Sequence, residues 1–299
     1  PTGADTVVPV EEIASADGTA TLTAPAGIDP GQFVHRQGTD YASGDALLAP
    51  GTPLAAPEVA VLSSVGQGHV RVGGVPRVAV VSTGDELVAA EDPVLPHQIR
   101  RANDYAIAAA LRQRGVGTPA AVHLRDDPEA MRAAVAELLD ATDVLVLSGG
   151  VSKGRFDYLP GILDELGVVK AFHRVRQRPG KPMWFGTLGE KLVFALPGNP
   201  VSALVCLHRY VLPALALGAG GTPRFGRAVL GADLAFRGDL TRFVPVIVTP
   251  DAGGAPVAVP RELNTSGDFF GLAGTQGFVE LDGDQGHWRA GTAVPFHPW

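Results

Sequence analysis

Cysteine is almost absent from this chain of 299 residues, in which Cys206 is the one thiol. A single cysteine excludes an internal disulfide and a metal site built from several cysteines. Cys206 lies in an apolar stretch with helical character, which favours a buried structural thiol over a nucleophile. We therefore expect the chemistry of this protein to depend on other residue types.

Long hydrophobic runs and excess positive charge are missing as well. Residues 201–217 come nearest to a membrane span, but His208, Arg209 and Pro213 interrupt them. The net charge of −7 argues against general affinity for nucleic acid. The opening residues are polar and turn-like, unlike a signal peptide. We expect a cytoplasmic protein without a nucleic-acid or membrane partner, and a start at Pro1 also fits a fragment of a longer chain.

Glycine and proline, in contrast, are abundant, with 38 and 25 residues, and hydrophobic residues make up 45% of the chain. This composition indicates a folded protein with many tight turns. The spacing of the turns divides the chain into three parts. Residues 1–74 and 218–299 alternate short apolar runs with turns, whereas residues 75–217 alternate strand and helix patterns.

We therefore predict an α/β protein in three parts. Residues 1–74 form a β-rich segment, with strands expected over residues 7–10, 20–22, 46–48 and 59–62. Residues 75–217 form a central, mostly parallel sheet sandwiched by helices. Residues 218–299 form a small β-barrel or sandwich.

Individual elements of the central part follow from strand patterns and helix start signals. Strands are expected over residues 77–81, 119–124, 143–147 and 168–177, with a hairpin of residues 183–188 and 191–196. Helices are expected over residues 103–114, 128–140, 157–166 and 200–217. Asn103 and Asp127 are the expected N-caps of the first two helices, and Pro128 suits the first helical position.

Glycine-rich turns follow several of these strands. They are Ser82-Thr83-Gly84-Asp85-Glu86-Leu87, Ser148-Gly149-Gly150-Val151-Ser152 and Leu196-Pro197-Gly198-Asn199-Pro200. Such turns leave backbone N–H groups free to hold an anion at the carboxyl edge of a parallel sheet. Lys153 and Arg155 fit either a phosphate ligand or the solvated surface. Together the turns predict an anion-binding edge.

Acidic residues near these turns are candidate ligands of Mg²⁺, which prefers one or two carboxylates plus substrate oxygens. Asp157 fits this role and that of a helix N-cap equally well. Asp126 has no capping role and follows a strand, so we favour it as the metal-side acid. Asp85 and Glu86 form a further pair, and the sequence does not say which of them faces the site.

Cations follow in the loop Arg178-Pro179-Gly180-Lys181-Pro182. Its prolines stiffen the backbone, which lowers the entropy that Lys181 loses when it binds an anion. Arg178 can bind an anion with a bidentate fork. A rigid turn with surface cations explains the same residues. Asn199 reads mainly as a turn residue and helix cap.

In this order, these motifs resemble the molybdopterin molybdenumtransferase family, which includes bacterial MoeA and the gephyrin E-domain. The resemblance also rests on Ile99-Arg100-Arg101-Ala102-Asn103 and on Asp126-Asp127-Pro128. It covers nearly the whole chain, most specifically between residues 77 and 217. It implies that molybdate is inserted into adenylylated molybdopterin with release of AMP, assisted by Mg²⁺. It also implies a homodimer that contacts other cofactor-synthesis proteins, and a further N-terminal region ahead of Pro1.

The resemblance assigns roles to individual residues. It implies that Ser152 and Asp157 contact phosphate and metal, that Asp126 is a second metal-side acid, and that Arg178 and Lys181 lie near pterin phosphate and molybdate. Arg242 and Ser266 align with a molybdate-site arginine and serine. The candidate catalytic residues are Glu86, Asp157, Arg178 and Lys181. The candidate binding residues are Thr83, Gly84, Ser148, Gly149, Gly150, Ser152, Lys181, Arg242 and Ser266, and the candidate metal ligands are Asp126 and Asp157.

Two other hypotheses compete with this enzyme. Arg101 stands where the family has an acid, and the absent N-terminal region matches a molybdopterin-binding module without catalysis. A molybdopterin adenylyltransferase shares the central sheet. The β-rich parts on either side of residues 75–217 argue against that second alternative.

Overall fold

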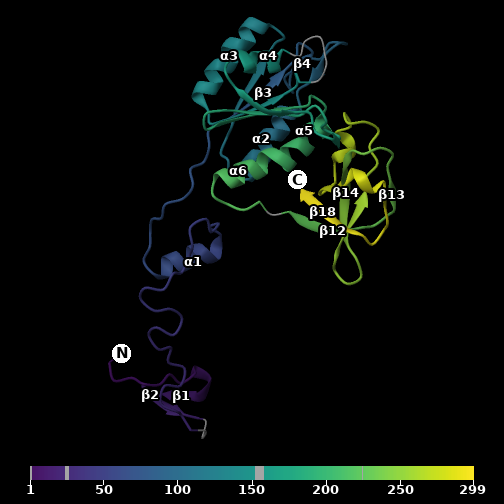
Figure 1. The fold of residues 1–299 in the computed structure, drawn as a ribbon. Helices are drawn as coiled ribbons and strands as arrows, with labels where there is room; N and C mark the ends of the chain where they lie inside the picture. The colour runs from purple at the N-terminus through teal and green to yellow at the C-terminus, as the bar shows by residue number, and fades with distance from the viewer. Residues whose placement is uncertain (1, 24–26, 152–157, 224) are drawn as a thin grey trace. The chain divides into compact units, whose positions relative to one another are not determined.

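The structure is a computed structural model that describes residues 2–23, 27–151, 158–223 and 225–299. The chain divides into two compact units, Pro1–Gly68 and His69–Trp299, and each is described by itself. Figure 1 shows the elements of both units.

The described residues of the N-terminal unit form a hairpin, an α-helix and a short 3-10 helix, Val10–Glu12. The hairpin consists of β1 (Ile13–Ala16) and β2 (Thr19–Leu22), and the α-helix is α1 (Ala56–Ser64). Of the strands expected here, only the one over residues 20–22 is found.

The strands expected over residues 7–10, 46–48 and 59–62 are wrong. Residues 59–62 lie inside α1, where the Glu58 carboxylate accepts a hydrogen bond of 2.9 Å from the backbone N–H of Ala55. Pro57 occupies the first turn of the same helix. These two start signals outweigh an apolar run that is too short to distinguish a strand from a helix.

The centre of the second unit is a six-stranded sheet in the order β6-β3-β7-β11-β10-β8. Its strands are β3 (Val78–Thr83), β6 (Ala120–Leu124), β7 (Val144–Ser148), β8 (Val169–His173), β10 (Trp184–Leu188) and β11 (Lys191–Leu196). The first four strands in this order run parallel to one another. β10 pairs antiparallel with β11, and β8 pairs antiparallel with β10. The predicted mostly parallel sheet is confirmed.

Helices cover both faces of this sheet, as Figure 1 shows. One face packs on α2 (Asn103–Gln113), α5 (Pro200–Cys206) and α6 (Leu212–Gly218), and the other on α3 (Pro128–Ala141) and α4 (Leu159–Glu165). All residues of β3 and β7 are buried, as expected for central parallel strands. Alternate residues serve the two faces: Val80 lies in one core and Val81 in the other.

The start of α3 follows the expected capping chemistry, and the start of α2 does not. Asp127 Oδ1 accepts hydrogen bonds from the backbone N–H groups of Glu129 (3.0 Å) and Ala130 (3.2 Å). Asn103 is the first residue of α2 and makes no cap, so that expectation is wrong. Its side chain points instead to neighbouring turns that are described below.

The last helical stretch of the central part, Pro200–Gly218, is interrupted by a π-helical turn, Leu207–Val211. Pro213 offers no N–H to a carbonyl one turn earlier, which explains why the regular ladder opens here. By length and composition this is the one helix, among the described residues, that could cross a membrane. Its apolar face lies in the core against the sheet, as in a buried helix of a folded domain.

The strand expected over residues 168–177 is split in two. Arg174 adopts a φ of +72° after β8, and the chain then forms β9 (Gln177–Arg178). This short strand leaves the central sheet and pairs in parallel with β14, where Arg178 is the register partner of Arg242. A strand next to the central sheet thereby joins the C-terminal barrel.

The C-terminal barrel is closed, since β15 pairs with both β12 and β14. Its strands are β12 (Gly226–Leu230), β14 (Thr241–Pro250), β15 (Pro256–Pro260), β16 (Gly277–Leu281) and β18 (Ala293–Pro298). Short pairs β13 (Leu234–Ala235) with β17 (His287–Trp288), and β4 (Leu87–Val88) with β5 (Ile99–Arg100), complete the unit. The small β-barrel is confirmed.

Side chains of the π turn connect the central part to the barrel. Arg209 Nε donates to Glu280 Oε2 (2.8 Å), and the His297 ring lies 2.8 Å from the same oxygen. The His208 Nδ1–H group donates to Pro298 O at 3.0 Å. The ion pair and these hydrogen bonds fix the barrel against the helix that runs under the central sheet.

Candidate active site

A cleft of about 1760 Å³ lies where the carboxyl ends of β3, β7 and β11 meet one side of the barrel. Every predicted site residue that the structure describes lines it. These residues are Thr83, Gly84, Glu86, Asp126, Ser148, Gly149, Gly150, Arg178, Lys181, Arg242 and Ser266. Ser152 and Asp157, together with Lys153 and Arg155, lie outside the described residues. The roles of all these residues stay predictions.

Backbone rather than side chain forms the cleft wall after β7. Gly149 and Gly150 have φ values of +102° and +68°, which disfavour other residues. A Cβ atom on Gly149 would lie 2.8 Å from Thr83 Oγ1, and one on Gly150 would lie 2.9 Å from Leu159 Cδ1. The turn therefore requires glycine at both positions, and its backbone is accessible to a ligand at close range.

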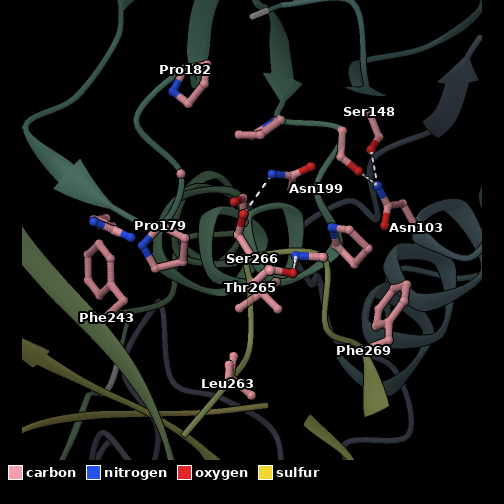
Figure 2. A pocket seen from close by; sticks show the side chains of 18 of the residues that line it. Asn103, Ser148, Pro179, Pro182, Asn199, Phe243, Leu263, Thr265, Ser266 and Phe269 are labelled. Atoms are coloured by element: carbon pink, nitrogen blue, oxygen red, sulfur yellow. Dashed lines mark hydrogen bonds between the residues drawn. The ribbon is translucent and has the colours of Figure 1, made fainter. Parts of the chain in front are cut away.

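Asn103 ties two of the glycine-rich turns together. Its Nδ2 donates to Ser148 Oγ (2.8 Å) and to Gly198 O (2.7 Å), and Figure 2 shows the first of these bonds. The first residue of α2 thus holds the end of β7 and the turn after β11 in a fixed relation. The sequence signal for this role was an amide side chain directly before a helix, which we interpreted as a cap.

Two of the three acidic residues, Asp85 and Asp126, hydrogen-bond to each other, and the third, Glu86, does not belong to this pair. Asp85 N donates to Asp126 Oδ2 (3.5 Å), and Asp126 N donates to Asp85 Oδ1 (3.3 Å). Asp126 and Glu86 line the cleft, whereas Asp85 lies outside its lining. This resolves the alternative that the sequence left open: Glu86, not Asp85, faces the cleft.

The carboxylates at the cleft fit a Mg²⁺ ion that takes its remaining ligands from substrate and water. Within the described ranges no three His, Cys, Asp or Glu side chains group as a metal site. Mg²⁺, however, keeps several waters and binds through one or two carboxylates plus substrate phosphates, and Asp126 offers such a carboxylate at the cleft. The residues present therefore fit a metal ion that binds together with its substrate.

Three cationic side chains, Arg178, Lys181 and Arg242, also line the cleft. Arg178 and Lys181 belong to the cation loop, which we define as residues 178–182, and Arg242 lies on β14 beside Arg178. None of the three makes an ion pair with any residue that the structure describes. Burial and the neighbouring Arg178 charge lower the pKa of Arg242. Like charges held side by side without counter-ions are typical of an anion-binding site.

Arg242 is held in place by neutral groups. Its Nη2 donates to Arg237 O (2.9 Å), and its guanidinium carbon lies 5.1 Å from the centroid of the Phe236 ring. Its Nε is buried and has no hydrogen-bond partner among the described residues. These contacts orient the Arg242 side chain, and neither of them neutralises its positive charge.

A hydrogen-bonded clasp joins the barrel to the turn after β11. Asn199 Nδ2 donates to Ser266 Oγ (2.7 Å), and Val201 N donates to Ser266 O (3.0 Å). Figure 2 shows the two side chains directed toward each other across the cleft. Asn199 occupies the N-cap position of α5 as expected, but its side chain makes no cap hydrogen bond and turns to Ser266 instead. Sequence reasoning missed the clasp because its partners are 67 residues apart.

Arg101 and Gln177 also line the cleft, and no sequence motif indicates a role for Gln177. Arg101 Nε lies 3.6 Å from Oδ2 of the buried Asp104, one helical turn further on. Arg101, which stands where the resemblance implies an acid, therefore forms an ion pair with Asp104 in the first turn of α2. Gln177 is buried beneath the cation loop.

Comparison with known proteins agrees with this geometry. Residues 79–217 match the family model described as a probable molybdopterin binding domain. Residues 1–66 match the MoeA N-terminal region (domain I and II), and residues 227–299 match the MoeA C-terminal region (domain IV).

Individual relatives cover the whole chain. A molybdopterin molybdenumtransferase from Synechocystis sp. is 39% identical over 100% of this chain and 75% of its own length. One from Staphylococcus aureus is 30% identical over 98% of this chain and 70% of its own length. A crystal structure of a molybdopterin biosynthesis MoeA protein from Pyrococcus horikoshii aligns with a TM-score of 0.75 and 30% identity, over 100% of this chain and 73% of that one. The chain belongs to the molybdopterin molybdenumtransferase family.

Proposed function

We propose that this chain inserts molybdate into adenylylated molybdopterin and releases AMP, with Mg²⁺ assisting. The observation that carries the proposal is that Arg178, Lys181 and Arg242, which form no ion pair with the described residues, share one cleft with a glycine-rich turn and two acids. Molybdate is a tetrahedral dianion, and arginine and lysine beside a serine hydroxyl are groups that bind such an anion. The names of the relatives support molybdenum chemistry at this site.

Each side of the cleft has a role in this proposal. The cations and Ser266 hold molybdate, while the backbone N–H groups around Gly149 and Gly150 hold a phosphate of the pterin nucleotide. Asp126 holds Mg²⁺, which supplies charge neutralisation at the phosphoryl oxygens when it is bound. Glu86, in the turn after β3, accepts the proton of the water that attacks phosphorus of the phosphoanhydride, and AMP leaves as the P–O bond breaks. The proposal retains the roles that the resemblance implies for Ser152 and Asp157, which are binding of the phosphate and of the metal.

Release of AMP from a phosphoanhydride develops negative charge that fixed cations stabilise without reorganisation. The register pairing of Arg178 with Arg242 sets two such charges before the ligand arrives. Binding of an anion relieves their mutual repulsion, so part of the cost of holding them together is returned on binding. The homodimer and the cytoplasmic location expected from the sequence remain part of the proposal.

The test compares two neighbouring acids. Asp126→Asn removes a carboxylate that lines the cleft, whereas Asp127→Asn keeps a good N-cap outside it, because Asn and Asp cap equally well. We expect wild type and Asp127→Asn to release AMP from adenylylated molybdopterin when molybdate and Mg²⁺ are present. Asp126→Asn should lower this rate by about 100-fold or more, as loss of a metal-side charge does.

Two results would contradict the proposal. Wild-type protein that releases no AMP yet binds the pterin nucleotide is a binding module and no transferase. With an active wild type, equal rates for Asp126→Asn and Asp127→Asn would remove Asp126 from the metal side.

A further inference from the structure

The cation loop rests on a buried amide. Gln177 directly precedes Arg178 on β9, and its side chain is fully buried with an exposed fraction of 0%. A buried amide without partners is costly, so its orientation is set by the groups that it contacts. Those groups belong to the cation loop on one side and to the helical stretch after Pro200 on the other.

Each polar atom of the Gln177 amide has a partner. Nε2 donates to Pro179 O (3.1 Å) and to Cys206 Sγ (3.5 Å), and Oε1 accepts a hydrogen bond from the Tyr210 hydroxyl. The amide can turn over only by losing these bonds. Gln177 is therefore locked between two elements that are distant in the sequence.

The same contacts fix the backbone of the cation loop. Cys206 Sγ lies 3.7 Å from Gly180 O, and a Cβ atom on Gly180 would lie 2.5 Å from Gln177 Nε2 and 2.6 Å from Cys206 Sγ. The loop is thus in van der Waals contact with the pair and has no room to settle further. Burial raises the pKa of the Cys206 thiol to about 12, which keeps it a neutral partner in this contact.

The loop carries its cations on either side of this anchor. Arg178 lies between Gln177 and Pro179, and Lys181 follows Gly180. Val175 N donates to Lys181 O (3.0 Å), which closes the loop behind the lysine. A shift of the amide would move both charges, because each is one residue from an anchored peptide group.

We propose that Gln177, held by Tyr210 and Cys206, is a positioning residue that keeps Arg178 and Lys181 in their anion-binding arrangement. Gln177 need not touch the anion itself. The identity of the anion as molybdate rests on the proposed function. The hold of Gln177 on the loop does not.

The experiment uses three variants and one control in the full chain. Tyr210→Phe removes one hydroxyl, Gln177→Met removes the amide, and the double variant removes both, so that neither partner leaves the other buried and unpaired. Tyr105→Phe is the matched control, since Tyr105 is 47% exposed on α2 and does not line the cleft. Each protein is measured by urea unfolding, by hydrogen exchange without ligand, and by equilibrium dialysis with molybdate.

A positioning role makes a specific pattern. The Met183 N–H group donates to Gly180 O (3.1 Å), so the amides of Val175 and Met183 both report on the loop. Tyr210→Phe and Gln177→Met should speed exchange at these two amides and weaken molybdate binding by about tenfold, the equivalent of one lost hydrogen bond. The double variant should be more stable than Gln177→Met, because no Tyr210 hydroxyl is left buried and unpaired, although the Pro179 carbonyl still lacks its donor. Its exchange should stay fast and its molybdate binding weak. Tyr105→Phe should match the wild type throughout.

Other patterns would overturn the inference. A double variant that regains molybdate affinity together with stability would give Gln177 a structural role only. Unchanged exchange at Val175 and Met183 in Tyr210→Phe would show that the loop does not depend on the amide. A wild type that binds no molybdate would refute the proposed function, and the exchange measurements would still decide whether Gln177 holds the loop.

Discussion

Arg242 offers a direct test of the anion site, because its replacement should affect binding and stability differently. Arg242→Met keeps most of the aliphatic stem over Phe236 but removes the charge and the hydrogen bond from Nη2 to Arg237 O. That lost neutral hydrogen bond is worth about 1 kcal/mol of folding free energy. The variant also removes the repulsion between Arg242 and its register partner Arg178.

The size of that repulsion follows from Coulomb's law. Two unit charges ~7 Å apart at an effective dielectric constant of about 20 repel by roughly 2 kcal/mol. Arg178 is exposed, so solvent and salt reduce this to about 1 kcal/mol or less. The gain and the loss nearly cancel, and we expect the free energy of unfolding to change by less than about 1 kcal/mol.

Binding has no such compensation. A charge-assisted hydrogen bond to an oxyanion contributes about 1.5–3 kcal/mol, so molybdate should bind about 10- to 100-fold more weakly. The matched control is Arg227→Met on β12, since the Arg227 Nη2 also donates to a backbone oxygen, Ala293 O at 2.8 Å, but does not line the cleft. Molybdate affinity is measured by equilibrium dialysis, and stability by unfolding in urea, which leaves ionic strength unchanged. Molybdate affinity within a factor of about two of the wild type would refute the anion site, because the lost contact is worth more than that.

Three further predictions follow from other parts of the structure. Asn199→Ala breaks the clasp to Ser266 and should weaken molybdate binding about tenfold in dialysis, because the serine hydroxyl loses its orientation. Gly149→Ala should lower the free energy of unfolding by about 2–4 kcal/mol in urea, since its Cβ meets Thr83 Oγ1 at a φ of +102°. Burial lowers the pKa of His208 to about 4, below its unfolded value, so stability should fall as the pH drops from about 6.5 to about 4, by roughly 3 kcal/mol. His208→Gln should remove that part of the pH dependence of unfolding.

Each of these predictions has a control. In a Ser266→Ala background, Asn199→Ala should have no further effect on binding, and additive losses would contradict the clasp. Gly189 has a φ of +58°, and a Cβ atom there would have no other atom within 4 Å, so Gly189→Ala should lower the free energy of unfolding by only about 1–2 kcal/mol. An equal loss in Gly149→Ala would contradict the close approach to Thr83. His35→Gln changes an exposed ring and should leave the pH dependence intact. A wild-type slope that survives His208→Gln would assign it to another group.

The central sheet could be predicted from the sequence because its strands are buried on both faces. Residues 78–81 and 144–147 are continuously apolar and lead into glycine-rich turns, the pattern expected for central parallel strands. The N-cap Asp127 was equally clear, since Pro128 follows it. Strand assignment was wrong over residues 59–62, where a short apolar run carries no period of its own and the helix start signals of α1 decide.

The site was predictable only in part, for a reason that lies in the topology. Thr83 ends a strand, Gly149 follows one and Lys181 lies in a stiff loop, so local patterns already indicate an anion-binding edge. Arg242 comes to the cleft through the pairing of β9 with β14, and Ser266 lies there through its hydrogen bonds with Asn199 and Val201; no local pattern in the sequence indicates either. The contacts of Asn103, Asn199 and Gln177 depend on partners that only the fold brings near.

The most direct test of the central claim is a single turnover with the wild-type chain. Adenylylated molybdopterin is mixed with the protein and Mg²⁺, and the AMP released and the molybdenum that co-elutes with the pterin are measured, with and without molybdate. Equal amounts of AMP and pterin-bound molybdenum, both dependent on molybdate, are the predicted result. AMP release without molybdenum in the product, or neither, would contradict the claim that this cleft inserts molybdate.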